Sequence, residues 1–283
     1  MIDKKRKIAV LASLSAMASV QGGASIAKIL FHSLGPAGVA TLRTGLAGIL
    51  LALINRPAVR KFSRKQWLYV LFYGFSTGAM NLIFYYGVQR IPLGLAVTLE
   101  FIGPLGLALL TSRRAPDFLW AILAGAGIAL IVPRGKQGSV NDLDLLGVIL
   151  VFIAGIMWAA YIVSGRKIAQ RMNNSDAVTC GMCVASALIL PFGVFSGDLF
   201  HLTPKLALLG LCVAVLSSAL PFTLDLFALK EIPSKVFSVL QSLQPAFAAL
   251  SGLIFLHELL TWTQWLAIFL VIMASMGATL SRD

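Results

Sequence analysis

The sequence predicts an all-α membrane protein of ten transmembrane helices, arranged as two inverted repeats of five helices each. Of its 283 residues, 58% are hydrophobic and only 12% are charged, whereas a soluble domain has about 25% charged residues. Ten apolar stretches reach the roughly 17–25 residues that a helix needs to cross a bilayer. A segment of the first half of the chain also recurs in the second half, which predicts the repeat.

Short connections join the ten predicted spans, and the longest of them are residues 55–65 and 134–142. A basic run at residues 4–7 precedes the first span, as it would precede the apolar part of a signal peptide. The apolar run continues to about Leu30, which is too long for a signal peptide, so we expect a retained helix. The spans are expected at about residues 8–30, 36–54, 66–88, 92–111, 117–133, 143–165, 177–197, 204–228, 234–256 and 261–280.

The repeat is carried by residues 91–104, which align without a gap with residues 232–245 at an offset of 141 residues. Both segments open with Ile-Pro and close with Pro. The two halves are then residues 8–141 and 142–283, with five spans each, and an odd number of spans turns the second half upside down. Inverted repeats of this kind recur in secondary transporters, whose solute site lies between the repeats.

The distribution of basic residues predicts that both termini lie in the cytoplasm. The chain has 23 Lys and Arg residues against 11 Asp and Glu, a net charge of +12. With a cytoplasmic N-terminus, 17 basic residues fall on the cytoplasmic side and 5 on the far side, while Arg43 lies within a span. Because the charges flank apolar runs, they indicate a lipid bilayer as the partner and argue against nucleic acid.

Arg43 and Glu100 are charged residues placed deep in predicted spans, where charge is costly and usually functional. At about 1.5 Å per residue, both lie roughly 10–12 Å below the far face, so they can meet. Two interpretations stay open. The residues form an amphoteric pocket, in which Arg43 binds a carboxylate and Glu100 an ammonium group, or they form an internal ion pair that locks two spans together.

Pro104 and Pro245 predict a kink at equivalent points of the two halves. Proline removes one amide and displaces the carbonyl four residues earlier, which belongs here to Glu100 or Gln241. Each kink then exposes a carbonyl beside a polar side chain, as in the broken helices of transporter sites. The alternative is a kink that serves helix packing alone. Pro221 is a third candidate hinge.

Polar residues at helical spacing add candidates for the solute site. Gln21 belongs to a polar stripe on the first span and Asn81 to one on the third, at the depth of Arg43 and Glu100. The alternative for each stripe is hydrogen bonding between helices. The predicted substrate-binding residues are Gln21, Arg43, Asn81, Tyr85, Glu100, Trp158, Tyr161 and Gln241.

Glu100 is also the first candidate for coupling transport to protons, because it is the only acidic residue deep in a span. Burial and a neighbouring guanidinium act in opposite directions on the proton affinity of a carboxyl group. A site that alternates between these environments can load and release a proton. Asp225, about three residues from the cytoplasmic end of the eighth span, is the next candidate.

The sequence offers no support for an enzyme. Its three histidines lie near the outer ends of spans, and it contains no H-E-x-x-H, no G-x-S-x-G and no phosphate-binding loop. Cys180 and Cys183 form a C-x-x-C pair inside an apolar run, where packing explains them better than a metal or redox site. We therefore expect no cofactor and no metal, and no ATP-driven transport by this chain alone.

Residues 17–28, 72–76, 78–81, 92–104, 112–118 and 274–280 resemble the EamA branch of the drug/metabolite transporter superfamily. Within these stretches, Gln21-Gly-Gly and Leu-Glu100-Phe are the more discriminating. The resemblance is strongest to bacterial exporters of threonine and homoserine. It implies the drug/metabolite transporter fold and a multi-pass exporter of small amino acids in the bacterial inner membrane, exchanging protons.

We therefore expect efflux of small polar amino acids, such as threonine and homoserine, by alternating access. One alternative is efflux of another solute, such as a cationic drug or a purine-like metabolite. A second, of a different class, is a channel or a non-transporting receptor. The expected partners are the amino acid, protons and lipid. The sequence does not fix the oligomeric state, and a monomer would suffice.

Overall fold

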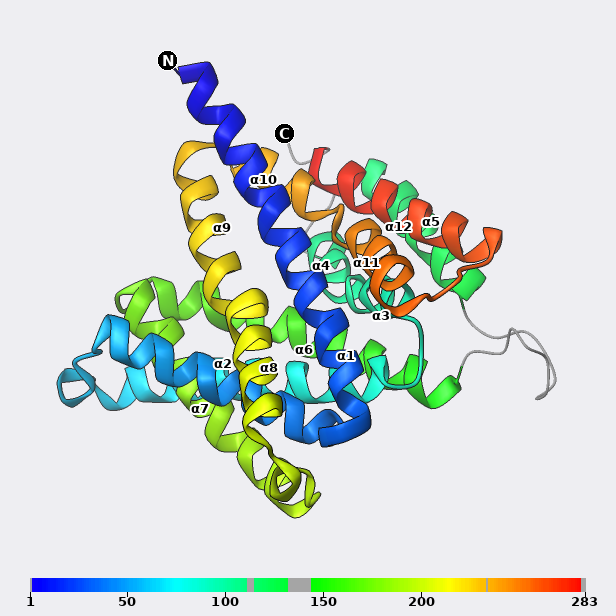
Figure 1. Cartoon of the computed structure of the whole chain (residues 1–283). Helices are drawn as coiled ribbons and strands as arrows, with labels where there is room; N and C mark the ends of the chain where they lie inside the picture. Colours follow the sequence, from blue (N-terminus) through cyan, green and yellow to red (C-terminus); the bar gives the residue numbers. More distant parts are fainter. Residues whose placement is uncertain (1, 111–114, 132–143, 233, 281–283) are drawn as a thin grey trace.

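The computed structural model describes residues 2–110, 115–131, 144–232 and 234–280, and these residues form helices without any strand (Figure 1). By length and composition, six described helices can cross a membrane, and three shorter apolar helices accompany them. Large apolar side chains such as Leu53, Phe72 and Phe269 lie exposed on the helix surfaces. The predicted all-α class is confirmed for the described residues.

Helix occupies each of the ten predicted stretches, although elements and stretches do not correspond one to one. The predicted boundary between the halves, at residues 141 and 142, lies outside the described residues. The elements are α1 (Ile2–Asn55), η1 (Val59–Lys61), α2 (Arg64–Val88), α3 (Leu93–Glu100), α4 (Ile102–Leu110), α5 (Ala115–Ile131), α6 (Leu145–Ala169), α7 (Asn174–Phe195), η2 (Asp198–His201), α8 (Pro204–Ala214), η3 (Val215–Ala219), α9 (Leu220–Glu231), α10 (Ser234–Gln241), α11 (Gln244–Leu256) and α12 (Trp262–Leu280).

The first two predicted spans join in α1, which bends sharply at Gly35. Gly35 has φ 55° and ψ 168°, a conformation that is strained for any residue with a Cβ. Pro36 follows it, and a proline fits the first turn of a helix because its missing amide would have no partner there. A single glycine therefore replaces the connecting loop that the sequence led us to expect.

Three other predicted spans are interrupted just before a candidate hinge proline. α3 ends at Glu100 and α4 begins at Ile102, shortly before Pro104. A π-helical turn, η3, precedes Pro221, and such turns often accompany functional sites. α10 ends at Gln241, and Pro245 lies in the first turn of α11.

The carbonyl of Glu100, which Pro104 leaves without its helical partner, packs against α6. A Cβ at Gly155 would lie 2.6 Å from this carbonyl oxygen, and a Cβ at Gly103 would collide with the backbone of Gly155. α4 and α6 approach this closely because both positions are glycine. This close approach is compatible with the interpretation of the kink as a packing feature, and the hinge at Pro104 stays a prediction.

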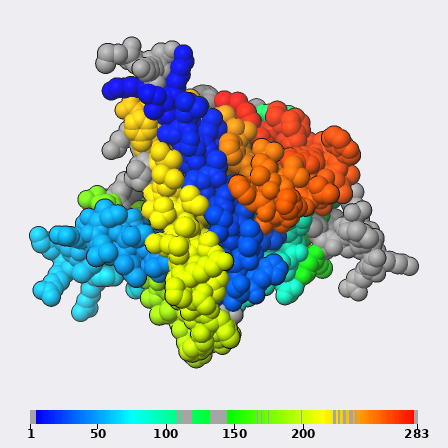
Figure 2. Space-filling view, viewed as in Figure 1, coloured from blue at the N-terminus to red at the C-terminus, as the bar shows by residue number. Residues whose placement is uncertain are grey.

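Two groups of helices meet at one end of the molecule and point in different directions at the other (Figure 1). α2 packs along α6 and α7, while α1 packs along α8, α9 and α11. Figure 2 shows α1 between α8–α9 and α11 on one face. We call the end that holds Gly35, Ile91 and His257 the loop end, and the end that holds the first turns of α1 the terminal end.

A partly buried ion pair lies at the loop end. Lys28 Nζ of α1 lies 2.7 Å from Glu258 Oε1, after α11, and donates to the carbonyl of Ile91 at 2.6 Å. The other carboxylate oxygen of Glu258 accepts from the amide of Leu93 at 2.7 Å. Both side chains are only 16–17% exposed. This Lys28–Glu258 cluster ties α1, the start of α3 and the end of α11 together.

Candidate functional site

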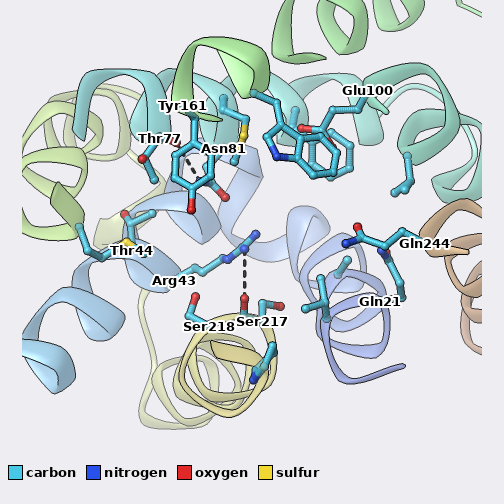
Figure 3. A pocket seen from close by; sticks show the side chains of 18 of the residues that line it. Gln21, Arg43, Thr44, Thr77, Asn81, Glu100, Tyr161, Ser217, Ser218 and Gln244 are labelled. Carbon is cyan, nitrogen blue, oxygen red and sulfur yellow. Dashed lines mark hydrogen bonds between the residues drawn. The ribbon is translucent and has the colours of Figure 1, made fainter. Parts of the chain in front are cut away.

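A cavity of about 220 Å³ lies between the two groups of helices, and residues of both halves of the chain line it (Figure 3). α1, α2 and α3 of the first half contribute, as do α6, α7, η3, α9 and α11 of the second. Its polar lining residues are Gln21, Arg43, Thr44, Tyr73, Thr77, Asn81, Glu100, Trp158, Tyr161, Ser217, Ser218 and Gln244.

Arg43 lies in the middle of the cavity and is held by two hydrogen bonds (Figure 3). Its Nη1 donates to the hydroxyl of Tyr85 at 3.0 Å, and its Nη2 donates to the carbonyl of Ser217 at 3.3 Å. The guanidinium also lies 5.5 Å from the centre of the Tyr85 ring. Because a guanidinium has five N–H donors, these contacts fix its position and leave donors for an anion in the cavity.

Tyr85 does not line the cavity itself. It is 1% exposed and packs its ring against Phe31 at 5.2 Å. In this structure Tyr85 orients Arg43, and its contact with a solute stays a prediction.

Glu100 lines the cavity at the last residue of α3 and is 7% exposed. Among the described residues it has no hydrogen bond and no ion pair. Figure 3 shows its side chain apart from Arg43. The internal Arg43–Glu100 ion pair, one of the two interpretations of the sequence, is thus not formed in the described part of the chain.

Asn81 lies across the cavity from Ser217 and Ser218, on α2 (Figure 3). Its Nδ2 donates to the carbonyl of Thr77 at 2.8 Å, and its side chain is 7% exposed. Next to it, Tyr161 pairs with Tyr73, with ring centres 5.0 Å apart. Both rings line the cavity.

The second half contributes Gln244 in place of Gln241. Gln241 does not line the cavity, and its Oε1 accepts from Nε2 of Gln244 at 2.7 Å. Sequence reasoning missed Gln244 because it followed the repeat alone. Gln244 comes three residues after Gln241, and side chains at this spacing are neighbours on a helical turn, so the pattern of the sequence contained a signal for it.

The remaining candidates have different positions. Gln21, Trp158, Tyr161 and Pro221 line the cavity, whereas Pro104 and Pro245 do not. Asp225 belongs to α9, but its side chain lies outside the described part of the structure.

The chemistry of the cavity fits a zwitterion. It offers a fixed cation, a buried carboxyl group that has no partner within the described part of the chain, and several hydrogen-bonding groups, with apolar side chains such as Ala24 and Val97 between them. Charges buried in this way need partners, and a solute with both charges can supply them. Among the described residues, no cluster of His, Cys, Asp and Glu could hold a metal ion.

Comparison with known proteins places these features in a family. The profile of the EamA-like transporter family matches the chain twice, at residues 7–133 and 145–280. The chain is 44% identical to the threonine/homoserine exporter RhtA of Salmonella typhimurium strain SL1344, over 96% of this chain and 91% of that protein. It is also 44% identical to RhtA of Escherichia coli strain K12, over 95% of this chain and 90% of that protein.

A crystal structure of a protein that is 16% identical to this chain shares the fold. The two align with a TM-score of 0.60 over 96% of each chain.

Proposed function

We infer, from the premise that this chain belongs to the EamA-like transporter family, that it exports small amino acids of the threonine and homoserine type by proton antiport. The observation that carries this proposal is the separation of Arg43 from Glu100 in one cavity. A carboxylate can bind at the guanidinium and an ammonium group at the carboxylate. The names of the 44% identical relatives support the same substrate class.

The size of the cavity favours a small amino acid over a drug. Pockets for drug-sized ligands have volumes of about 300–1,000 Å³, whereas this cavity has about 220 Å³. Efflux of larger cationic drugs, the alternative within the same superfamily, is therefore less compatible with the geometry.

We propose the ten-span architecture of two inverted repeats for the membrane-embedded protein. Two consecutive matches to one family profile support it, as does the helix found in each of the ten predicted stretches. The bacterial inner membrane is the proposed location, with both termini in the cytoplasm.

We further propose that transport proceeds by alternating access and that this structure is the loading state. The Lys28–Glu258 cluster closes the loop end, whereas the helices diverge toward the terminal end (Figure 1). With cytoplasmic termini, the cavity would receive solute from the cytoplasm. Opening of the loop end would then release the solute outward.

Proton coupling follows from the chemistry of Glu100. A protonated carboxyl group no longer attracts an ammonium group, so a proton entering from outside would expel the solute. Asp225 is the second candidate for this step.

The test is transport by purified protein in liposomes with an imposed pH gradient. We expect the gradient to drive accumulation of radiolabelled threonine and homoserine against their concentration gradients. Equilibration without accumulation would favour a channel, and absence of any flux would favour a receptor. Accumulation of a cationic drug or a purine but of neither amino acid would overturn the substrate assignment and retain the transporter.

A further inference from the structure

The amide of Asn81 presents one defined atom to the cavity. The carbonyl of Thr77 can only accept a hydrogen bond, so the Asn81 atom that faces it at 2.8 Å must be Nδ2. The remaining atom, Oδ1, is then an acceptor. Figure 3 shows it directed into the cavity, on the side of Arg43.

This acceptor has no hydrogen-bond partner among the described residues, although Asn81 is only 7% exposed. An acceptor in such a site gains from a donor and loses when an apolar group covers it. Arg43 directs two of its donors to Tyr85 and Ser217 instead. A bound solute can therefore supply the donor for Asn81.

A bound amino acid has few donors to give. Its carboxylate has none, and its ammonium group is attracted to the buried carboxyl group of Glu100. The remaining donor of a small amino acid is a hydroxyl on its side chain. Phe84 follows Asn81 by three residues on α2 and also lines the cavity, so an apolar surface lies beside the acceptor for the carbon atoms of that side chain.

We propose that Asn81 selects amino acids with a side-chain hydroxyl by accepting the hydroxyl hydrogen through Oδ1. This inference rests on the proposed function and adds a residue that sets its specificity. A carbonyl-type oxygen accepts over a broad range of directions. One acceptor can therefore serve hydroxyls on different carbons, such as those of threonine and homoserine.

The experiment compares pairs of amino acids that differ only by a methyl group in place of the hydroxyl. Valine corresponds to threonine in this way, and norvaline corresponds to homoserine. Apparent dissociation constants are measured from tryptophan fluorescence of the purified full-length protein, since Trp158 lines the cavity. We expect the wild type to bind threonine and homoserine about tenfold more tightly than their partners, or better.

Asn81→Leu removes the acceptor and keeps the same branched skeleton of side-chain heavy atoms, and Asn81→Ala removes it without adding volume, so one variant can stand in if the other does not fold. Both are expected to lose most of the preference within each pair while retaining affinity for valine and norvaline. Ser76→Ala is the matched control, because Ser76 bonds to Phe72 of its own helix and does not line the cavity.

The outcomes separate the proposal from the function on which it rests. Equal weakening of all four amino acids would mean that Asn81 binds the common backbone groups, and an unchanged preference would mean that it does not contact the solute. Either result overturns the proposal. Absence of threonine and homoserine binding to the wild type would instead overturn the proposed function.

Discussion

Arg43 and Glu100 are tolerated in the interior for different reasons. Arg43 has two protein acceptors that hold it in place, Tyr85 and the carbonyl of Ser217. The second acceptor is a backbone group of the π-helical turn η3. Glu100 has no such partner among the described residues. The cavity therefore pairs a positioned cation with a carboxyl group whose charge state is free to change.

Arg43→Lys is predicted to weaken binding while preserving the fold. A lysine retains the charge, but its compact ammonium group cannot reproduce the planar fork that bonds Tyr85 and Ser217 and still offers two parallel donors to a substrate carboxylate. We expect the apparent dissociation constant for threonine to rise about tenfold or more. Arg90→Lys is the matched control, since Arg90 forms a half-exposed ion pair with Asp144 away from the cavity. Normal affinity in a folded Arg43→Lys protein would exclude direct carboxylate binding by Arg43.

Glu100→Gln is predicted to uncouple transport from protons. Glutamine resembles the protonated carboxyl group and cannot release a proton, so the variant should fold and lose acceleration by a pH gradient. Transport in liposomes is measured with and without the gradient, with Asp144→Asn as the control for an exposed carboxylate. If the gradient accelerates Glu100→Gln as it does the wild type, the coupling residue lies elsewhere, and Asp225 is tested next.

Among the individual residues of the site, the sequence predicted the charged residues at its centre but not all of the residues that surround them. Arg43, Asn81 and Glu100 could be found because polar residues deep in apolar spans are conspicuous. Whether Gln244 and Ser217 reach the cavity depends on where the helices break and on the conformation of the turn at each break. The repeat pointed to Gln241, yet the break between α10 and α11 turns Gln244 to the cavity instead.

At the scale of the elements, local sequence determines where the helices are interrupted. Contacts with neighbouring helices determine the angle between the two segments of each interrupted helix. Pro104, Pro221 and Pro245 predicted where regular helix would fail. They did not predict that the single non-helical residue Gly35 would join the first two predicted spans, or that η3 would be a π-helical turn. Hydropathy gives the length of an apolar stretch, whereas the bend within it depends on the helices packed alongside.

Gly103→Ala is predicted to destabilise the crossing of α4 and α6. The added Cβ would collide with the backbone of Gly155, which cannot move like the end of a side chain. Overpacking of this kind costs about 1–3 kcal/mol, seen as a lower melting temperature in detergent. Gly106→Ala on the same helix is the control, because a Cβ there meets nothing within 4 Å, and it should be neutral or stabilising. Equal melting temperatures would show that the two helices do not cross as closely as described.

For the whole molecule, the charge asymmetry predicts the orientation in the membrane. With 17 basic residues on one side and 5 on the other, both termini should lie in the cytoplasm. A reporter that works only in the cytoplasm should be active when fused at the C-terminus and inactive when fused at Gly197, between α7 and α8. Activity of the fusion at Gly197 and not at the C-terminus would contradict the orientation, whereas equal activity of both fusions would contradict the ten-span inverted repeat.

The Lys28–Glu258 cluster joins residues that are distant in the sequence. In the alternating-access mechanism that we propose, the loop end would open at this cluster. Glu258→Gln retains an oxygen for the Leu93 amide and removes the charge that balances Lys28. Removal of one charge leaves the other charge of the pair without its partner and destabilises the conformation in which the loop end is closed. The equilibrium between conformations should therefore shift toward those with an open loop end.

The shift can be measured by labelling Ala27→Cys, a fully buried position next to Lys28, in a protein whose three native cysteines have been replaced. We expect Glu258→Gln to speed labelling by a membrane-impermeant thiol reagent about tenfold or more. Asp144→Asn, which breaks the more exposed ion pair to Arg90 at the same end, should change the rate little. Equal labelling rates in the two variants would mean that the Lys28–Glu258 cluster stabilises the fold without controlling the opening of the loop end. If the cluster controls this opening, loss of its own ion pair must raise the labelling rate more than loss of the neighbouring Arg90–Asp144 pair does.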